Sequence, residues 1–128
     1  MTDILRRALR LVEERRADAY AGMAGSLDGL SLAVSVSVSD CLVLRGAEGA
    51  LREEPVEGRA AIRISTDRDS VRALLAGRMT LNESLRSGAI ELAGTAEALG
   101  HGLRAFEFFV CALLRIDEAE QLRRELER

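Results

Sequence analysis

One segment near the C-terminus, LRAFEFFVCALLRI (residues 103–116), is apolar over more than half of a helical circumference. At ~100° per residue, Arg104, Glu107 and Arg115 fall on one narrow wedge together with Cys111. A helix that packs on a single sheet needs an apolar stripe only ~100° wide. We therefore expect something besides its own sheet to cover the helix 103–116.

Length and charge restrict the class of protein. We expect residues 1–128 to form a single domain, because this length matches the usual domain size. The net charge of −3 carries no electrostatic signal for nucleic-acid binding. No apolar run reaches the ~18 residues of a membrane-spanning helix. Cys41 and Cys111 are far apart and follow no signal peptide, so we expect free thiols in a bacterial cytoplasm.

The first half of the chain has the alternation of half-buried strands. Between residues 30 and 39, leucines and valines alternate mainly with serines, which indicates a strand with one apolar and one wet face. Ser39–Asp40 is expected to turn into a second strand over residues 41–46. Further strands are expected at residues 49–54, near an edge, and at residues 60–65. A helix over residues 3–19 and a glycine-rich loop over residues 21–30 precede them.

The second half is mainly helical. We expect a helix capped by Thr66 that ends at Gly77, and a short helix that begins with the Thr80–Glu83 capping box. A fifth strand follows at residues 89–94, and Thr95 can cap the next helix.

Gly100 and Gly102 are expected to bend or break that helix before residue 103. A charged helix ends the chain, with Leu122 and Leu126 as its large apolar contacts. This order predicts an α+β fold, an antiparallel sheet with helices on one face.

No catalytic or metal-binding constellation is apparent. His101 is the only histidine, and no set of carboxylates or thiols has the spacing of metal ligands. Nucleotide and hydrolase motifs are absent from the sequence. We therefore expect no enzyme, no metal and no cofactor; a thiol enzyme using Cys41 or Cys111 is a minor alternative.

Residues 62–94 resemble the sterol carrier protein type 2 family. The matching motifs are Ile62-x-Ile64-Ser65, Leu74-Leu75-x-Gly77-Arg78-Met79 and Gly88-x-Ile90-x-Leu92-x-Gly94. The resemblance implies a five-stranded, mainly antiparallel sheet whose helices enclose a hydrophobic tunnel for fatty acids, phospholipids or sterol-like lipids. It also implies a set of tunnel-lining residues, here Leu74, Leu75, Met79, Leu85, Leu92, Phe106, Phe109 and Val110.

Two functions from different classes follow. The leading hypothesis is a non-catalytic protein that binds or carries lipids in an apolar tunnel. The alternative is a protein-interaction module without a lipid ligand, which pairs with an enzyme subunit or forms a homodimer through the helix 103–116. A large apolar surface on a small protein is typical of such interfaces.

Overall fold

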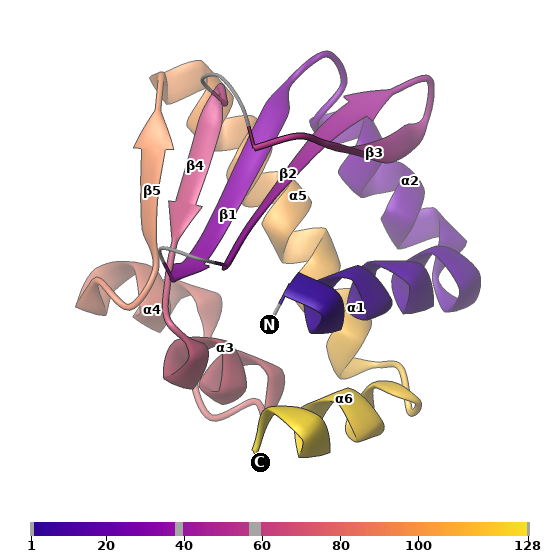
Figure 1. Ribbon diagram of the computed structural model, residues 1–128, viewed down its shortest axis with the longest axis vertical. Helices are drawn as coiled ribbons and strands as arrows, with labels where there is room; N and C mark the ends of the chain where they lie inside the picture. The colour runs from indigo at the N-terminus through magenta and orange to yellow at the C-terminus, as the bar shows by residue number, and fades with distance from the viewer. Residues whose placement is uncertain (1, 38–39, 57–59, 128) are drawn as a thin grey trace.

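In the part of the chain that the structure describes, five strands form one mixed sheet in the order β3-β2-β1-β4-β5 (Figure 1). The computed structural model describes residues 2–37, 40–56 and 60–127. The strands are β1 (Ser31–Ser37), β2 (Asp40–Ala47), β3 (Ala50–Glu54), β4 (Ile62–Ser65) and β5 (Glu91–Gly94). The β1–β2, β2–β3 and β4–β5 pairs are antiparallel, and β1 pairs with β4 in parallel, Leu32 facing Ile62. The predicted mainly antiparallel sheet, with its third strand at an edge, is confirmed.

The described residues also form six helices, which accompany the sheet. They are α1 (Thr2–Arg15), α2 (Ala17–Ser26), α3 (Arg68–Leu75), α4 (Leu81–Ser87), α5 (Ala96–Leu114) and α6 (Ala119–Leu126). In Figure 1, α5 crosses behind the sheet, while the face toward the viewer carries no helix. The α+β class with helices on one face is therefore confirmed.

Buried apolar side chains and more exposed serines alternate along β1, as predicted. Leu32 and Val36 are buried, whereas Ser35 is half-buried and Ser37 is exposed. Ser31 is the exception, because it is buried and its Oγ accepts a hydrogen bond from the Ala61 amide at 3.0 Å. The expected turn at Ser39–Asp40 lies partly on residues 38–39, which are outside the described residues.

The segment 21–30, predicted to be a loop, instead contains most of α2. The single helix expected over residues 3–19 also ends at Arg15, and α2 starts at Ala17. The small residues are explained by packing. A Cβ atom added to Gly22 would lie 2.6 Å from the Phe108 ring, so glycine lets α2 approach α5 closely. Tertiary contact outweighs the low helix propensity of glycine here.

The break expected at Gly100 and Gly102 is also wrong, because α5 runs unbroken through both residues. Gly102 is buried against β4, and an added Cβ would lie 2.9 Å from Cγ2 of Ile62. That contact gives the glycine a packing role inside the helix. A Cβ at Gly100 would meet nothing within 4 Å.

The residues that cap and end the helices in the second half of the chain are those predicted from the sequence, with one exception. Thr80 and Thr95 accept hydrogen bonds from the amides of Glu83 and Ala98, as predicted. Gly77 and Gly88 have the left-handed φ values of 73° and 80° that end helices. The cap of α3, however, is Asp67, whose Oδ1 accepts from the Ser70 amide at 2.8 Å. Thr66 instead donates its hydroxyl to the Ala89 carbonyl at 2.9 Å.

The capping role of Asp67 can be tested by substitution. We expect Asp67→Ala to lower the free energy of unfolding by about 1 kcal/mol, because an amide of the first turn of α3 loses its acceptor. The conservative variant Asp67→Asn keeps an acceptor oxygen and should stay within a few tenths of a kcal/mol of the parent. Urea denaturation measures both, and equal losses in the two variants would contradict the assignment.

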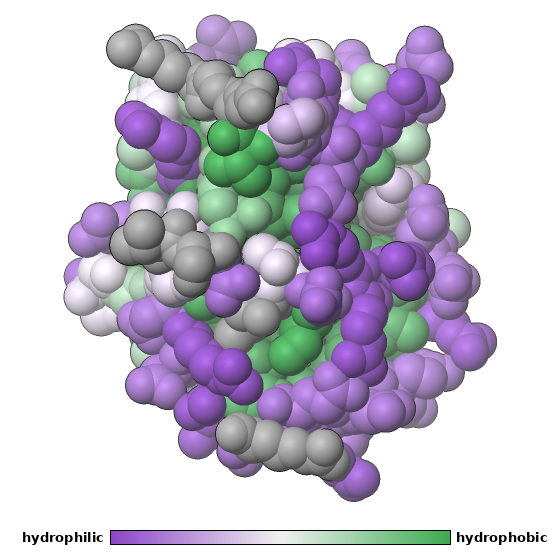
Figure 2. All heavy atoms as spheres, viewed as in Figure 1, coloured by the Kyte–Doolittle hydropathy of each residue, from purple (hydrophilic) through white to green (hydrophobic). Residues whose placement is uncertain are grey.

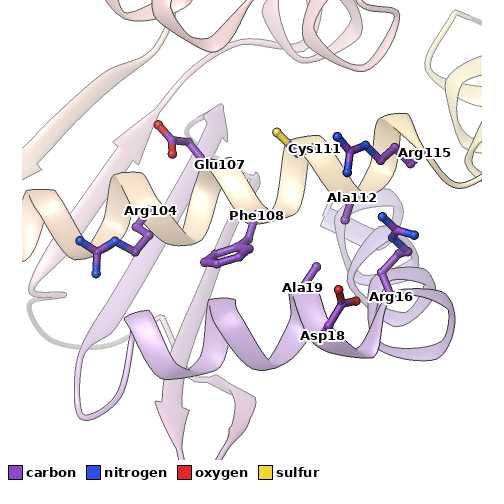
Figure 3. A pocket seen from close by; sticks show the side chains of 9 residues that line it. All are labelled: Arg16, Asp18, Ala19, Arg104, Glu107, Phe108, Cys111, Ala112 and Arg115. Atoms are coloured by element: carbon purple, nitrogen blue, oxygen red, sulfur yellow. The ribbon is translucent and has the colours of Figure 1, made fainter.

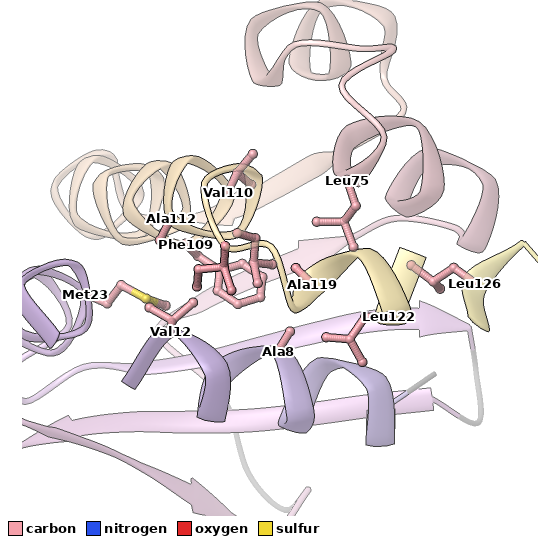
Figure 4. Packing of buried hydrophobic residues seen from close by; sticks show 12 residues of the cluster. Ala8, Val12, Met23, Leu75, Phe109, Val110, Ala112, Ala119, Leu122 and Leu126 are labelled. Atoms are coloured by element: carbon pink, nitrogen blue, oxygen red, sulfur yellow. The ribbon is translucent and has the colours of Figure 1, made fainter. Parts of the chain in front are cut away.

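The protein itself covers α5, which answers the question raised by the segment 103–116. Phe109, Val110 and Leu113 are buried in one cluster with residues of α1, α2, α3 and α6, part of which is seen in Figure 4. Ala105 is buried against the sheet in a second cluster. Of the large apolar residues of α5, only Phe108 and Leu114 are exposed, at 37% and 43%. The predicted contacts of α6 are confirmed, since Leu122 and Leu126 are both buried.

Candidate ligand-binding site

An apolar cavity lies between the sheet and the helices. It encloses about 40 Å³, and every side chain that lines it is apolar. Two strands, three helices and the residue that ends α2 contribute to its wall: Leu32, Val34, Leu42 and Leu44 from β1 and β2, Leu5 and Leu9 from α1, Met23 and Leu27 from α2 and its end, and Ala105, Phe106 and Phe109 from α5. Because no polar group lines it, the cavity can hold only an apolar molecule or the apolar part of one.

The strand wall follows from the period of two. Leu32 and Val34 of β1 point to the same side of the sheet as Leu42 and Leu44 of β2, because β1 and β2 pair with Leu32 opposite Leu44 and Val34 opposite Leu42. The intervening residues lie on the other face. Ala33, Ser35 and Val43 line a separate, more polar hollow there.

Helix α1 forms one side of the cavity and is tied down by ion pairs at the surface. Leu5 and Leu9 face the cavity, while Arg6 and Arg7 on the outer side bind other elements. Arg6 pairs with Glu53 of β3 at 2.6 Å, and Arg7 pairs with Glu125 of α6 at 2.5 Å. On this side of the molecule, a mostly hydrophilic surface surrounds the apolar residues (Figure 2).

The ion pair with Arg6 shifts the pKa of the Glu53 carboxyl. Its hydrogen bond with the Arg6 guanidinium, helped by charge attraction, holds the pKa of the Glu53 carboxyl below its ordinary value. A lowered carboxyl pKa in the folded state stabilises that state above the ordinary pKa, and the contribution is lost as the pH falls through the lowered value. The Arg6–Glu53 ion pair, which links α1 to β3, therefore contributes fully at neutral pH, and its contribution is lost in acid.

The residues that the resemblance implies as lining are spread over the core. Phe106 and Phe109 line the cavity. Leu74 is buried with Ile62, Ile64 and Ile90 in a neighbouring cluster, against which half-buried Leu85 and Leu92 pack. The other three do not line the cavity: Leu75 and Val110 lie in the cluster that also contains Phe109 and residues of α1 and α6, and Met79, half-buried, lies between α3 and α4.

Most of the cavity wall comes from residues that the sequence analysis did not propose as lining. The leucines and valines of residues 30–39 were predicted only to form one apolar face of a strand, and the apolar residues of β2 and α1 only to belong to a strand and a helix. The signal that could have found them is the pairing of two adjacent alternating strands beneath an amphipathic helix. Such a pairing predicts which apolar faces meet, although it does not show where a gap remains between them.

The cavity is small in this conformation. Pockets that hold small organic ligands usually measure ~300–1,000 Å³, so about 40 Å³ accommodates far less than a long acyl chain. A larger ligand would have to displace part of the wall. The helix α1 contributes two of the lining residues and is held at the surface by the ion pairs of Arg6 and Arg7.

The described residues offer no metal centre and no membrane helix. Nowhere in residues 2–37, 40–56 and 60–127 do three or more His, Cys, Asp or Glu side chains gather as metal ligands do. None of the helices in the same ranges has the length and hydropathy needed to cross a bilayer. Both cysteines are free thiols: Cys41 is half-buried in β2, and Cys111 is exposed on α5.

Comparison with known proteins gives the fold a name. No protein-family model matches the sequence, and no curated protein is significantly similar to it. Among solved structures, a crystal structure of sterol carrier protein 2 superposes with a TM-score of 0.62 at 24% identity, covering 89% of this chain and 95% of that one.

Two further structures agree. A conserved hypothetical protein from Thermus thermophilus has a TM-score of 0.56 at 25% identity, covering 84% of this chain and 81% of its own. The ligand-free sterol carrier protein 2 of Yarrowia lipolytica has a TM-score of 0.52 at 13% identity, covering 90% of each chain. With its five-stranded mixed sheet backed by helices, this chain has the sterol carrier protein 2 fold.

Proposed function

We propose that this protein binds a lipid, or another small hydrophobic molecule, without catalysis. The observation that carries the proposal is the apolar cavity between the sheet, α1, α2 and α5. The fold supports it, because two of the similar structures are named sterol carrier proteins. Residues 1–128 would act as one domain in a bacterial cytoplasm, where Cys41 and Cys111 remain reduced.

The chemistry of the wall favours an acyl chain over a polar ligand. Each buried methylene contributes up to ~0.8 kcal/mol of binding free energy. No arginine, histidine or hydroxyl group lines the cavity to hold a carboxylate. A fatty acid or phospholipid would therefore place its chain inside and its head group in water, and affinity would depend mainly on chain length.

Entry of a chain requires the cavity to widen, and α1 is the element we expect to move. It contacts β2 and α6, and its outer contacts are the exposed ion pairs of Arg6, Arg7 and Arg15. Exposed pairs of this kind contribute little to stability. Displacing α1 therefore costs mainly the burial of its apolar side chains, which an incoming acyl chain replaces.

The alternative function, an interaction or dimerisation module, has less support. It rested on the uncovered apolar surface expected for the helix 103–116. The chain's own α1, α2, α3 and α6 contact most of that surface, which leaves Phe108 and Leu114 as its exposed large apolar side chains.

Titration with fatty acids of increasing length tests the proposal. We expect the affinity to rise with each added methylene, by at most about fourfold, which corresponds to ~0.8 kcal/mol. Calorimetry measures the affinity, and native mass spectrometry of the purified protein shows any lipid already bound. An affinity that does not change with chain length would overturn the proposal.

Two matched variants on opposite faces of the sheet locate the site. Val34→Phe adds volume on the cavity side of β1, and we expect it to lower the affinity for a long fatty acid by about tenfold or more. Val43→Phe makes the same change on the outer face of β2 and should leave the affinity unchanged. Equal effects of the two variants would place the ligand elsewhere.

A further inference from the structure

A second hollow lies on the other side of α5, where α5 runs beside α2 (Figure 3). It measures about 370 Å³, which falls within the range of small-molecule sites. We call it the α2–α5 groove. It shares no residue with the apolar cavity, and its lining residues are Arg16, Asp18, Ala19, Arg104, Glu107, Phe108, Cys111, Ala112 and Arg115.

Three arginines of the groove have no ion-pair partner within 4.0 Å among the residues that the structure describes: Arg16, Arg104 and Arg115. Their neighbour Arg15 does find one, Glu118, at 3.2 Å. Most other arginines of the described chain are similarly paired. With three arginines against Asp18 and Glu107, the lining of the groove carries a formal charge of +1 in a protein whose net charge is −3.

Arg16 is the least expected of the three. It occupies the N-cap of α2, where a small side chain that accepts a hydrogen bond is preferred and a cation opposes the helix dipole. Its side chain makes no capping hydrogen bond. Its Nε atom is also buried without a hydrogen-bond partner among the described residues. Arg16 nevertheless lines the groove, so an anion bound there would face its guanidinium group and would also interact favourably with the start of α2.

The middle of the groove is apolar. Phe108 lies against Gly22 of α2, yet 37% of its surface remains exposed. Figure 3 shows Phe108 directed from α5 toward α2, with Arg16 and Arg115 beyond it at one end. A cationic end next to an exposed aromatic ring suits a molecule that joins an anionic group to a short apolar body. Asp18 and Glu107 also line the groove. Because their carboxylates repel other anionic groups, the groove favours compact anions whose charge lies at the arginines.

We propose that the α2–α5 groove binds a small organic anion, with a phosphate or carboxylate group held by Arg16 and Arg115 and the apolar body against Phe108. This site is distinct from the lipid cavity, since it lies on the opposite side of α5. Its ligand is recognised by charge, whereas a ligand of the cavity is recognised by chain length.

Cys111 lines the groove and is exposed, so its reactivity reports on occupancy. In a Cys41→Ser background, Cys111 is the only thiol, and its rate of alkylation by N-ethylmaleimide can be followed while n-hexyl phosphate is added. We expect saturable protection by n-hexyl phosphate, weaker protection by inorganic phosphate, and none by n-hexanol. No protection by n-hexyl phosphate, or equal protection by n-hexanol, would overturn the proposal.

Three variants in the same background assign the contacts. Arg16→Gln and Arg115→Gln should each weaken n-hexyl phosphate binding by about tenfold, because each removes a charged hydrogen-bond donor. Arg86→Gln removes an exposed arginine from α4, outside the groove, and should change nothing. Thermal melting confirms that each variant is folded. Folded arginine variants that retain full protection would place the anion elsewhere and overturn the proposal.

Discussion

Replacing Leu74 with Asp is expected to lower the free energy of unfolding by about 3–5 kcal/mol, the usual cost of an uncompensated buried charge. Leu74 is only 3% exposed and packs among Ile62, Ile64 and Ile90, which offer no hydrogen bond and no counter-charge. Urea denaturation measures the loss. A protein of this size has ~5–15 kcal/mol of total stability, so the variant would be close to unfolding.

The matched variant Leu85→Asp separates core positions from ligand-lining ones. Leu85 is half-buried at the margin of the same cluster, where water can reach a carboxylate, so the loss should be smaller. The family resemblance implies both leucines as lining. If Leu74→Asp costs less than ~1 kcal/mol and also abolishes fatty-acid binding, a hydrated tunnel must extend to Leu74, and its place in a closed core would be refuted.

Adding a single methyl group at Gly46 should be almost as damaging. A Cβ atom at this position of β2 would lie 2.5 Å from the carbonyl oxygen of Leu27 and 2.8 Å from that of Ala24. Neither partner can retreat easily, because Gly46 also exchanges backbone hydrogen bonds with residues 29 and 30. We expect Gly46→Ala to lower the free energy of unfolding by about 3 kcal/mol, at the upper end for overpacked sites.

Gly100→Ala is the control for that prediction. Gly100 lies within α5, and an added Cβ would meet nothing within 4 Å. Alanine is the better helix former, so we expect this variant to gain ~0.5–1 kcal/mol. The two glycine variants should therefore move the urea midpoint in opposite directions. A loss at both positions would mean that the close approach of β2 and α2 is not what makes Gly46 sensitive.

The strands were predictable because their signal is local. Each of these strands buries one face, and the burial is visible in the strand's own sequence: in the alternation of residues 30–39 and in the apolar pair Ile62 and Ile64. The helix α2 was missed because its glycines and alanines have low amphipathic contrast. Their role in packing appears only when Phe108, 86 residues after Gly22 in the sequence, packs against it. Gly102 within α5 was misjudged for the same reason, since its partner is Ile62.

The candidate site was harder to anticipate than the fold. Motif residues between Ile62 and Gly94 indicated a resemblance to a family, and the two aromatic residues that the resemblance implies, Phe106 and Phe109, lie in the cavity wall. A cavity, however, is a place where packing is incomplete. Its position depends on how α1, α5 and the first two strands fit together, and no single segment of sequence contains that information.

The parallel pairing of β1 with β4 also affects the order in which this chain can assemble. The meander β1-β2-β3 needs only neighbouring residues and can pair soon after it is synthesised, but the other edge of β1 must wait for Ile62, 30 residues after Leu32. Until β4 arrives, that edge presents unpaired backbone groups, a template for association with other chains. Contacts of long sequence separation also slow folding. Early folding of the protein is therefore exposed to aggregation at the strand that later becomes the centre of its sheet.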